Sequence, residues 1–467
     1  MWHQTARKRR RARGSLVLVL ALFASATAAC GARWTDEQRT AFLDRQQEGG
    51  STSVDKPIGG TTDRTGGGLS DSTGGSSADA GTSPDAAGPG EEPGATGPRP
   101  CAQPSEAPGV SDTQIAIGSI SSLSGPVPGL GETSAAAARA YVAYRNANGG
   151  VCGRELVLRQ ADDGTDNSGY RRSLQDLAPK VLGIAGGIAL GDVAGGDLVD
   201  RFAIPIVNTP SGSSKSRFVF DVNPDYPRPD LLIGKYKYLF EQGVRTVAMA
   251  YLSVEATRRE AGVQRGLMEA AGLKVVDVNE LPITTLSYDA AARRAANSGA
   301  NYLWTLFDTQ GYASMARAVT GTGYDWLFKD FSYQTYGTDF IDLAGNAAEG
   351  VSAWLRSLPT EESSRNDAMG RFVEWMNQVA PGLSQDILAI DSWVSLRIFV
   401  EALEGLPGPI SRQGLVERLT SMGRYDADGM FAPIDVGREL AEGCFIGVVV
   451  RDGRWQRLAP AGDGFLC

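Results

Sequence analysis

The chain has 467 residues, enough for two or three domains, and a formal net charge of −9 at pH 7. An acidic surface argues against nucleic-acid binding, so no nucleic-acid partner is expected. The only histidine is His3, in a segment that we expect to be removed, which excludes Ser–His and Cys–His nucleophile pairs and histidine-based zinc sites from the mature protein. We expect neither a metal nor a cofactor.

A basic run followed by a short apolar segment opens the chain. Residues 15–29 are too few for the ~20 apolar residues that span a bilayer, and they suit the apolar core of a secretory signal peptide over residues 1–29. The residues Thr27-Ala28-Ala29 before Cys30 resemble a bacterial lipobox, whose cysteine carries two acyl chains. We therefore expect export and lipid anchoring at Cys30 on the outer face of the cell membrane. The alternative is an ordinary signal peptide followed by a chance cysteine.

Residues 30–107 are predicted to form the lipid anchor and a tether. From Gly49 to Pro100 the chain consists mainly of Gly, Ser, Thr, Asp and Pro, with almost no large apolar residues. Such a segment cannot bury enough surface to offset the entropy of ordering, so we predict disorder. A disordered tether of this length would hold the folded part away from the membrane.

The first folded unit is predicted within residues 114–163. Alternating isoleucines from Ile115 predict a buried strand, and the alanine-rich run that follows predicts a helix. Gly149 and Gly150 stop that helix, and Val157 starts the next strand. A strand–helix–strand unit of this kind usually forms a parallel sheet.

The same alternation continues along the chain. Strands are predicted at 179–184, 204–207, 217–221, 244–251, 273–278 and 300–307, and helices at 192–202, 255–271, 288–297, 386–403 and 411–421, with one more ending near Gly321. This pattern predicts two α/β sets joined through residues 221–230. Near the C-terminus, FIGVVVRDGRWQRL predicts a hairpin that turns at Asp452-Gly453.

Five cysteines occur, and assigning Cys30 to lipid leaves four in an exported protein, which implies disulfides. Three pairings are possible. We favour Cys101–Cys152, because these residues precede the first two strands, and Cys444–Cys467, because they flank the predicted hairpin.

The motifs SLSGP, PGLGE and NANGGVCGRELVLRQADDGTDN, in this order, resemble the opening of type I periplasmic binding proteins. The most similar subgroup is the branched-chain amino acid receptors of ABC importers, and the resemblance runs from about Gly109 to the C-terminus. It implies an α/β fold of two Rossmann-like lobes joined by a hinge with several crossovers. Lobe 1 would comprise residues 108–225 and 355–440, and lobe 2 residues 226–354 and 441–467.

The resemblance also implies a ligand site in the loops that follow the strands, where open α/β sheets bind ligands. Matching the family positions one by one gives Ser124, Leu130, Leu190, Gly191, Asp192, Thr209, Gly212 and Ser213 in lobe 1, and Tyr251, Phe307, Asp308, Tyr333 and Gln334 in lobe 2. The stretch from Leu190 to Asp192 falls where the family has three serines that bind an amino acid head group. A plain branched-chain amino acid is therefore in doubt, and Asp192 favours a ligand with an ammonium group or several hydroxyls.

Several of these residues have a purely structural interpretation. Asp192 could cap a helix, Thr209 and Ser213 could be turn residues, and Phe307 and Tyr333 could belong to the core.

Two adjacent acids, Asp162 and Asp163, invite a catalytic interpretation. Neighbouring residues at a strand end point to opposite sides, so we expect turn and cap roles rather than a catalytic pair.

We therefore predict an exported, lipid-anchored and monomeric solute-binding protein that is not an enzyme. It would capture a small polar, amino-acid-like ligand between its lobes and deliver it to the permease and ATPase subunits of an ABC importer. One alternative is a ligand sensor for a membrane signalling partner. Another is a surface carbohydrate hydrolase that uses paired carboxylates.

Overall fold

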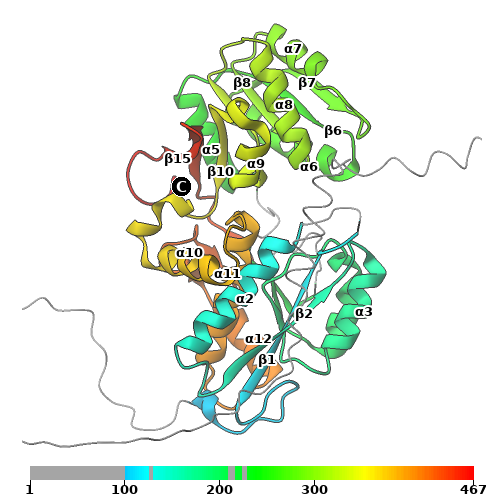
Figure 1. The fold of residues 1–467 in the computed structure, drawn as a ribbon, viewed down its shortest axis with the longest axis vertical. Coiled ribbons are helices and arrows are strands. Elements are labelled where there is room, and N and C mark those ends of the chain that lie inside the picture. Colours follow the sequence, from blue (N-terminus) through cyan, green and yellow to red (C-terminus); the bar gives the residue numbers. More distant parts are fainter. Residues whose placement is uncertain (1–99, 126–129, 209–215, 223–228) are drawn as a thin grey trace, which may run out of the picture. The chain divides into compact units, whose positions relative to one another are not determined.

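Two large β-sheets organise the part of the chain that the computed structural model describes, residues 100–467 without 126–129, 209–215 and 223–228 (Figure 1). The predicted signal peptide, Cys30 and almost all of the predicted tether lie outside the described residues. Within these residues no helix is both long enough and apolar enough to cross a membrane.

The first sheet has five parallel strands in the order β2-β1-β3-β4-β5. Its strands are β1 (Gln114–Ser121), β2 (Glu155–Asp162), β3 (Ile184–Ala185), β4 (Ile206–Asn208) and β5 (Val219–Asp221). Its connecting helices are α2 (Glu132–Ala147), α3 (Asn167–Leu177) and α4 (Gly196–Phe202), the last preceded by the 3₁₀ helix η2 (Asp192–Gly195). Helix α3 was not predicted, and the strand predicted at 179–184 is confined to β3.

Successive side chains of β1 explain why this strand is buried on both faces. Ile115 and Ile117 belong to the cluster that includes α2, whereas Ala116 and Ile120 pack with Leu174 of α3. Helices therefore cover both faces of the sheet, as parallel strands require.

The second sheet has seven strands in the order β15-β14-β10-β9-β8-β6-β7. Its parallel strands are β6 (Thr246–Leu252), β7 (Lys274–Leu281), β8 (Tyr302–Leu306), β9 (Phe328–Asp330) and β10 (Val351–Leu355). Its helices are α5 (Pro229–Glu241), α6 (Glu255–Ala270), α7 (Asp289–Asn297), α8 (Thr309–Gly321) and α9 (Thr338–Ala344), with the 3₁₀ helices η3 (Tyr333–Thr335) and η4 (Gly345–Ala348).

The C-terminal hairpin completes this sheet. Strands β14 (Ile446–Arg451) and β15 (Arg454–Ala459) pair antiparallel, and β14 pairs antiparallel with β10. Both turn residues have a positive φ, 53° at Asp452 and 69° at Gly453, as a two-residue turn of type I′ requires. The predicted turn is confirmed.

The remaining elements lie between β10 and β14 in the sequence. They are the 3₁₀ helix η5 (Thr360–Arg365), the helices α10 (Asp367–Val379), α11 (Ile387–Glu404) and α12 (Arg412–Ser421), and a small antiparallel sheet of β11 (Arg424–Tyr425), β12 (Ile434–Asp435) and β13 (Leu440–Ala441). A short 3₁₀ helix, η1 (Pro100–Ala102), opens the described chain. Helices α5, α9 and α10 were not predicted, nor was β9.

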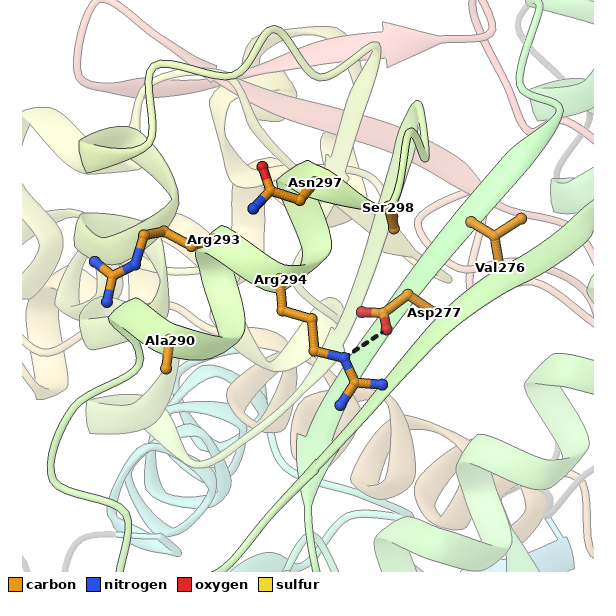
Figure 2. Close-up of a pocket in the computed structure, with 7 residues that line it drawn as sticks. All are labelled: Val276, Asp277, Ala290, Arg293, Arg294, Asn297 and Ser298. Atoms are coloured by element: carbon orange, nitrogen blue, oxygen red, sulfur yellow. Dashed lines mark hydrogen bonds and ion pairs between the residues drawn. The ribbon is translucent and has the colours of Figure 1, made fainter.

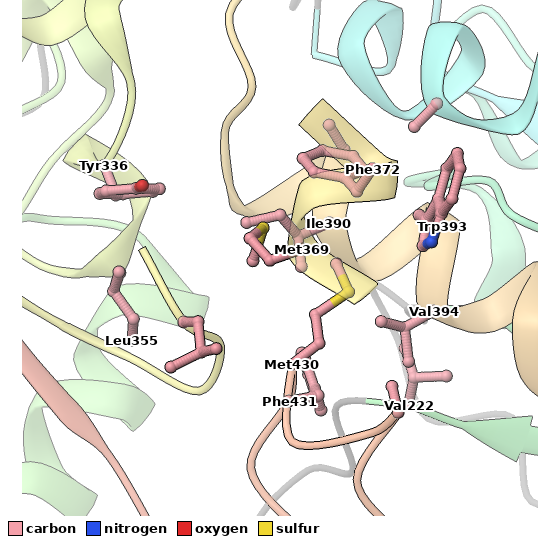
Figure 3. Packing of buried hydrophobic residues seen from close by; sticks show 14 of the residues in the cluster. Val222, Tyr336, Leu355, Met369, Phe372, Ile390, Trp393, Val394, Met430 and Phe431 are labelled. Carbon is pink, nitrogen blue, oxygen red and sulfur yellow. The ribbon is translucent and has the colours of Figure 1, made fainter. Parts of the chain in front are cut away.

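Aromatic packing around Trp393 of α11 joins three helices. Trp393 stacks on Tyr144 of α2 at 5.7 Å and meets Phe372 of α10 edge to face at 5.6 Å. Figure 3 shows Trp393 and Phe372 beside Met369 of α10 and Ile390 of α11. Helix α10 contributes to this cluster because its apolar residues recur on one face.

Both predicted disulfides are present, Cys101–Cys152 and Cys444–Cys467. Arg154 lies beside the first one with only 3 % of its surface exposed. Its guanidinium donates to the carbonyls of Ser111, Cys101, Cys152, Ala102 and Gln103. The segment before β1 is therefore fixed both covalently and by hydrogen bonds.

Candidate functional site

Most of the predicted site residues that the structure describes lie in loops after the carboxyl ends of the parallel strands β1 to β3 and β6 to β9, and we call these loops the rim loops. In the first sheet they comprise the described residues 122–125, 130–131, 163–166 and 186–195. In the second sheet they comprise residues 253–254, 282–288, 307–308 and 331–337.

A buried carboxylate, Asp163, joins three rim loops of the first sheet. Only 2 % of Asp163 is exposed. Its carboxylate accepts hydrogen bonds from the Ser122 hydroxyl at 2.8 Å, the Thr165 amide at 2.8 Å and the Gly191 amide at 3.0 Å. The Ser122 oxygen in turn accepts a bond from the Leu190 amide at 3.0 Å. The loops after β1, β2 and β3 are therefore held in one fixed arrangement.

The neighbouring Asp162 organises the loop after β1. It accepts hydrogen bonds from the amides of Leu123, Ser124 and Gly164 and from the Ser124 hydroxyl. Partial burial disfavours its charge, but these bonds outweigh that effect and hold the pKa of Asp162 below its usual value. Both acids thus serve the loops, which confirms the predicted turn roles. The predicted cap role is wrong, because Asp166 is the N-cap of α3.

Three of the predicted residues lie together in the loop after β3. Leu190 is 38 % exposed, whereas Gly191 and Asp192 are buried. A side chain at Gly191 would meet the Asp166 carbonyl at 2.5 Å, so only glycine fits there. Asp192 is the first residue of η2 and Gly191 is its N-cap, so the interpretation of Asp192 as a helix cap is wrong.

The other predicted residues of the first sheet are less informative. Ser124 is exposed and Leu130 is half-buried, and the two belong to the loop after β1. Thr209, Gly212 and Ser213 lie outside the described residues.

Two predicted aromatics of the second sheet are packed in its core. Tyr251 is 9 % exposed and meets Trp304 edge to face at 6.5 Å. Phe307 is 4 % exposed and lies between Tyr288 at 5.1 Å and Tyr312 at 6.0 Å. Both rings stand near the rim, at the ends of the neighbouring strands β6 and β8.

The remaining predicted residues of the second sheet differ in their roles. Asp308 caps α8 and accepts the Gly311 amide at 2.6 Å. Tyr333 is half-buried and Gln334 is exposed, both in η3. The sequence prediction missed the part played by Ser122.

Two hollows in the described surface lie away from the rims. A shallow groove runs between the amino-terminal half of β7 and α7 (Figure 2), where Arg294 pairs with Asp277 at 2.8 Å. A cavity of about 80 Å³ lies between α2, α10 and α11, lined by aromatic and charged side chains that include Tyr141, Trp393 and Glu401. Neither contains a predicted site residue. No group of three or more Cys, His, Asp or Glu residues suited to a metal occurs in the described part of the chain.

Comparisons with known proteins agree with this geometry. A family model for periplasmic binding proteins matches residues 114–453, while no curated protein matches the chain. A fatty acid ABC transporter substrate-binding protein from Thermomonospora curvata is similar at 20% identity, with a TM-score of 0.63, over 76% of this chain and 93% of that one.

Two further solved structures are similar. A putative branched-chain amino acid ABC transporter from Rhodospirillum rubrum has 19% identity and a TM-score of 0.56, over 74% of this chain and 100% of that one. An ABC transporter substrate-binding protein from Sphaerobacter thermophilus has 18% identity and a TM-score of 0.63, over 76% of this chain and 98% of that one. At these identities the likeness shows the fold.

Proposed function

This chain belongs to the periplasmic binding protein family, and we propose that it captures a small polar, amino-acid-like ligand for an ABC importer. Membership makes it an exported binding protein rather than an enzyme. The observation that carries the proposal is the family match over residues 114–453, which spans the first sheet, every strand of the second sheet except β15, and their rim loops. The names of similar solved structures, which include ABC transporter substrate-binding proteins, support the importer as partner.

The two sheets support a division into two lobes. Strands β1 to β5 fall within the proposed lobe 1, residues 108–225 and 355–440. Strands β6 to β10 begin within the proposed lobe 2, residues 226–354 and 441–467, and the last hairpin joins their sheet. A ligand held between lobes would be enclosed by hinge closure.

The residues proposed to contact the ligand are those that follow strand ends. Leu190, Gly191 and Asp192 occupy the loop that Asp163 fixes, so their backbone is preorganised for binding. Among the predicted residues of the second sheet, Tyr333 and Gln334 are the most accessible ones that do not cap a helix.

We also propose a lipid anchor at Cys30 and a monomeric state. Labelling cells with an alkynyl fatty acid should mark the wild-type protein and leave a Cys30→Ser variant unmarked and released from the membrane. Equal labelling of both would contradict the anchor. Sedimentation of the purified protein tests the oligomeric state.

A thermal-shift screen with amino acids, polyamines, amides and sugars tests the function. A ligand present at 100 times its Kd should stabilise the folded state by ~2.7 kcal/mol, which is a measurable shift. For a cationic ligand, Asp192→Asn should weaken binding, whereas Asp176→Asn on the exposed side of α3 should not. Ligand turnover, or equal losses in both variants, would contradict the proposal.

A further inference from the structure

The cavity between α2, α10 and α11 lies apart from the rim loops and contains none of the proposed ligand contacts. Its volume is about 80 Å³. Because one water needs roughly 10–15 Å³ of such space, the cavity has room for about five water-sized groups. Its lining includes Arg145 of α2, Arg371 of α10, and Arg397 and Glu401 of α11. The cavity can therefore hold a small polar group.

Hydrogen-bond donors dominate the polar lining of this cavity. Three of the lining residues are arginines, and an arginine side chain carries five N–H donors and no acceptor. Among the described lining residues Glu401 is the only acid, and its carboxylate already accepts from Arg397 at 2.6 Å. A group that enters the cavity must therefore supply hydrogen-bond acceptors.

Two of the arginines are only partly paired by the protein. Arg145 donates through Nη2 to the Glu404 carboxylate at 2.6 Å, but its Nε is buried without a hydrogen-bond partner. Arg371 lies 3.8 Å from the Asp428 carboxylate, which is too far for a hydrogen bond. A buried N–H without an acceptor is unfavourable, so an acceptor beside these guanidinium groups stabilises the protein.

The acids around the cavity are already paired. Arg397 donates to Glu401 and to Asp428. Arg145 donates to Glu404. Neither Glu404 nor Asp428 lines the cavity, and the side chain of Asp428 is 66 % exposed, so water weakens its field. The lining itself carries three positive charges and one negative charge, which favours an anion.

Aromatic rings give the cavity rigid walls. The Trp393 ring meets the Tyr141 ring edge to face at 5.0 Å and stacks on Tyr144 at 5.7 Å, and all three residues line the cavity. Tyr141 and Trp393 are 1 % and 2 % exposed. Walls held in this way keep the shape of the cavity before a ligand arrives, so binding loses little entropy.

We propose that this cavity binds a small oxyanion, such as free phosphate, sulfate or a short carboxylate, between the guanidinium groups of Arg145 and Arg371. Guanidinium groups recognise oxyanions through paired, charge-assisted hydrogen bonds, which are roughly twice as strong as neutral ones. The bound anion joins α2 to α10. The site lies outside the rim loops, so the inference does not depend on the proposed function.

Calorimetric titration of the purified protein in a chloride buffer tests this site, with phosphate, sulfate and acetate as separate probes. At least one of them should bind with a Kd of about 1 mM or tighter. Arg371→Gln should weaken that binding about tenfold or more, because a hydrogen bond to a charged group is lost. The side chain of Arg371 is 39 % exposed, so this variant should fold. Arg371→Lys keeps the charge but not the paired donors and should lose less affinity.

Further measurements separate binding in the cavity from binding elsewhere. Ala368 lines the cavity and is 3 % exposed, so Ala368→Val should fill part of it and prevent binding without removing a charge. Arg172→Gln, at an exposed arginine of α3, is the matched control and should bind as the wild type does. Glycerol phosphate is too large for the cavity and should bind more weakly than free phosphate, whereas a surface site for phosphate head groups would bind both equally.

The absence of measurable binding by all three anions would overturn the inference, because the cavity would then hold only water. Equal affinities of the wild type and Arg371→Gln would overturn it too. So would a loss in Arg172→Gln as large as in Arg371→Gln, unchanged binding in Ala368→Val, or glycerol phosphate binding as tightly as free phosphate, since each would place the anion outside the cavity.

Discussion

The Ser122 hydroxyl donates a hydrogen bond of 2.8 Å to the Asp163 carboxylate, across 41 residues of sequence. Ser122 follows β1 and Asp163 follows β2, and both are buried. The bond therefore ties two rim loops together below the surface, and the Gly191 amide adds the third. A binding loop fixed in this way loses little entropy when a ligand arrives.

Replacing Asp163 with alanine should destabilise the protein by about 2–4 kcal/mol, because three donors, two of them in buried hydrogen bonds, lose their acceptor. Urea unfolding measures the loss. Asp163→Asn should cost less, since it keeps one acceptor oxygen. The matched control is Asp176→Ala, whose partner Lys180 is exposed and which should change stability by less than about 0.5 kcal/mol. A loss for Asp163→Ala no larger than for the control would contradict the assignment.

The sequence showed that Asp163 sits in a turn, but not which loops it joins. Hydrophobic periodicity and turn residues predict only the local backbone. They could not identify Ser122 and Gly191 as partners of Asp163, because both are distant from it in the sequence. Burial was equally hard to foresee for Tyr251 and Phe307. An aromatic residue at the end of a strand can pack in the core or contact a ligand, and the sequence does not distinguish the two. The ring contacts with Trp304 and Tyr288 show that these two residues pack in the core.

A second prediction concerns a buried ion pair in the second sheet. Lys235 of α5 lies 2.6 Å from the carboxylate of Asp330, which is 1 % exposed as a side chain. The Tyr302 hydroxyl donates to the same oxygen. Lys235→Met should cost about 3–5 kcal/mol, because it leaves a buried carboxylate without its counter-charge.

The double variant Lys235→Met/Asp330→Asn is the control for this charge argument. Removing the carboxylate's charge should recover a large part of the stability lost in Lys235→Met. Denaturant unfolding of the four proteins in the cycle gives the coupling energy. Additive losses would mean that Lys235 acts through its contact with the Trp354 ring rather than through the ion pair with Asp330.

The third prediction concerns the disulfides. Cys101–Cys152 closes a loop of 51 residues and Cys444–Cys467 a loop of 23. By loop entropy, replacing each pair with serines should cost about 4 and about 3 kcal/mol respectively. Thermal melts of the two double variants, each with and without reductant, check this. Each variant keeps one disulfide, so reductant should lower its melting temperature only by breaking that remaining disulfide.

Secondary structure was predictable where the local pattern was strong. The hairpin turn at Asp452-Gly453 and the helix before Gly149 follow from residue chemistry alone. The strand predicted at 179–184 was too long because Pro179 and Lys180 end the preceding turn. Only Ile184 pairs with both neighbouring strands, and Ala185 pairs with β4 alone. Helix α10 went unpredicted although Met369, Phe372 and Met376 have helical spacing, which is a signal that a closer count would have found.

The last prediction is a pH dependence at the start of α11. Asp386 caps this helix through the Ala389 amide at 2.9 Å and accepts the Thr133 hydroxyl at 3.0 Å. Burial of its carboxylate raises the pKa of Asp386 from 3.8 to about 6, and the nearby Asp339 adds to the rise. A carboxyl with a raised pKa contributes stability below its unfolded value of 3.8, and this contribution is lost as the pH rises through 6.

Asp386→Asn removes the charge and keeps an oxygen that can cap the helix. The free energy of unfolding of the variant should match that of the wild type near pH 4 and exceed it by about 1–2 kcal/mol at pH 8. This gain is smaller than the full pKa shift implies, because Asp386 is only half-buried. Urea unfolding from pH 4 to pH 8 measures the difference. Asp166→Asn is the control, because the Gly169 amide bond lowers the pKa of this exposed cap, so its charge favours folding at neutral pH and its loss should give no gain at pH 8. A constant difference between Asp386→Asn and the wild type over this range would mean that cap geometry, not ionisation, governs this helix start.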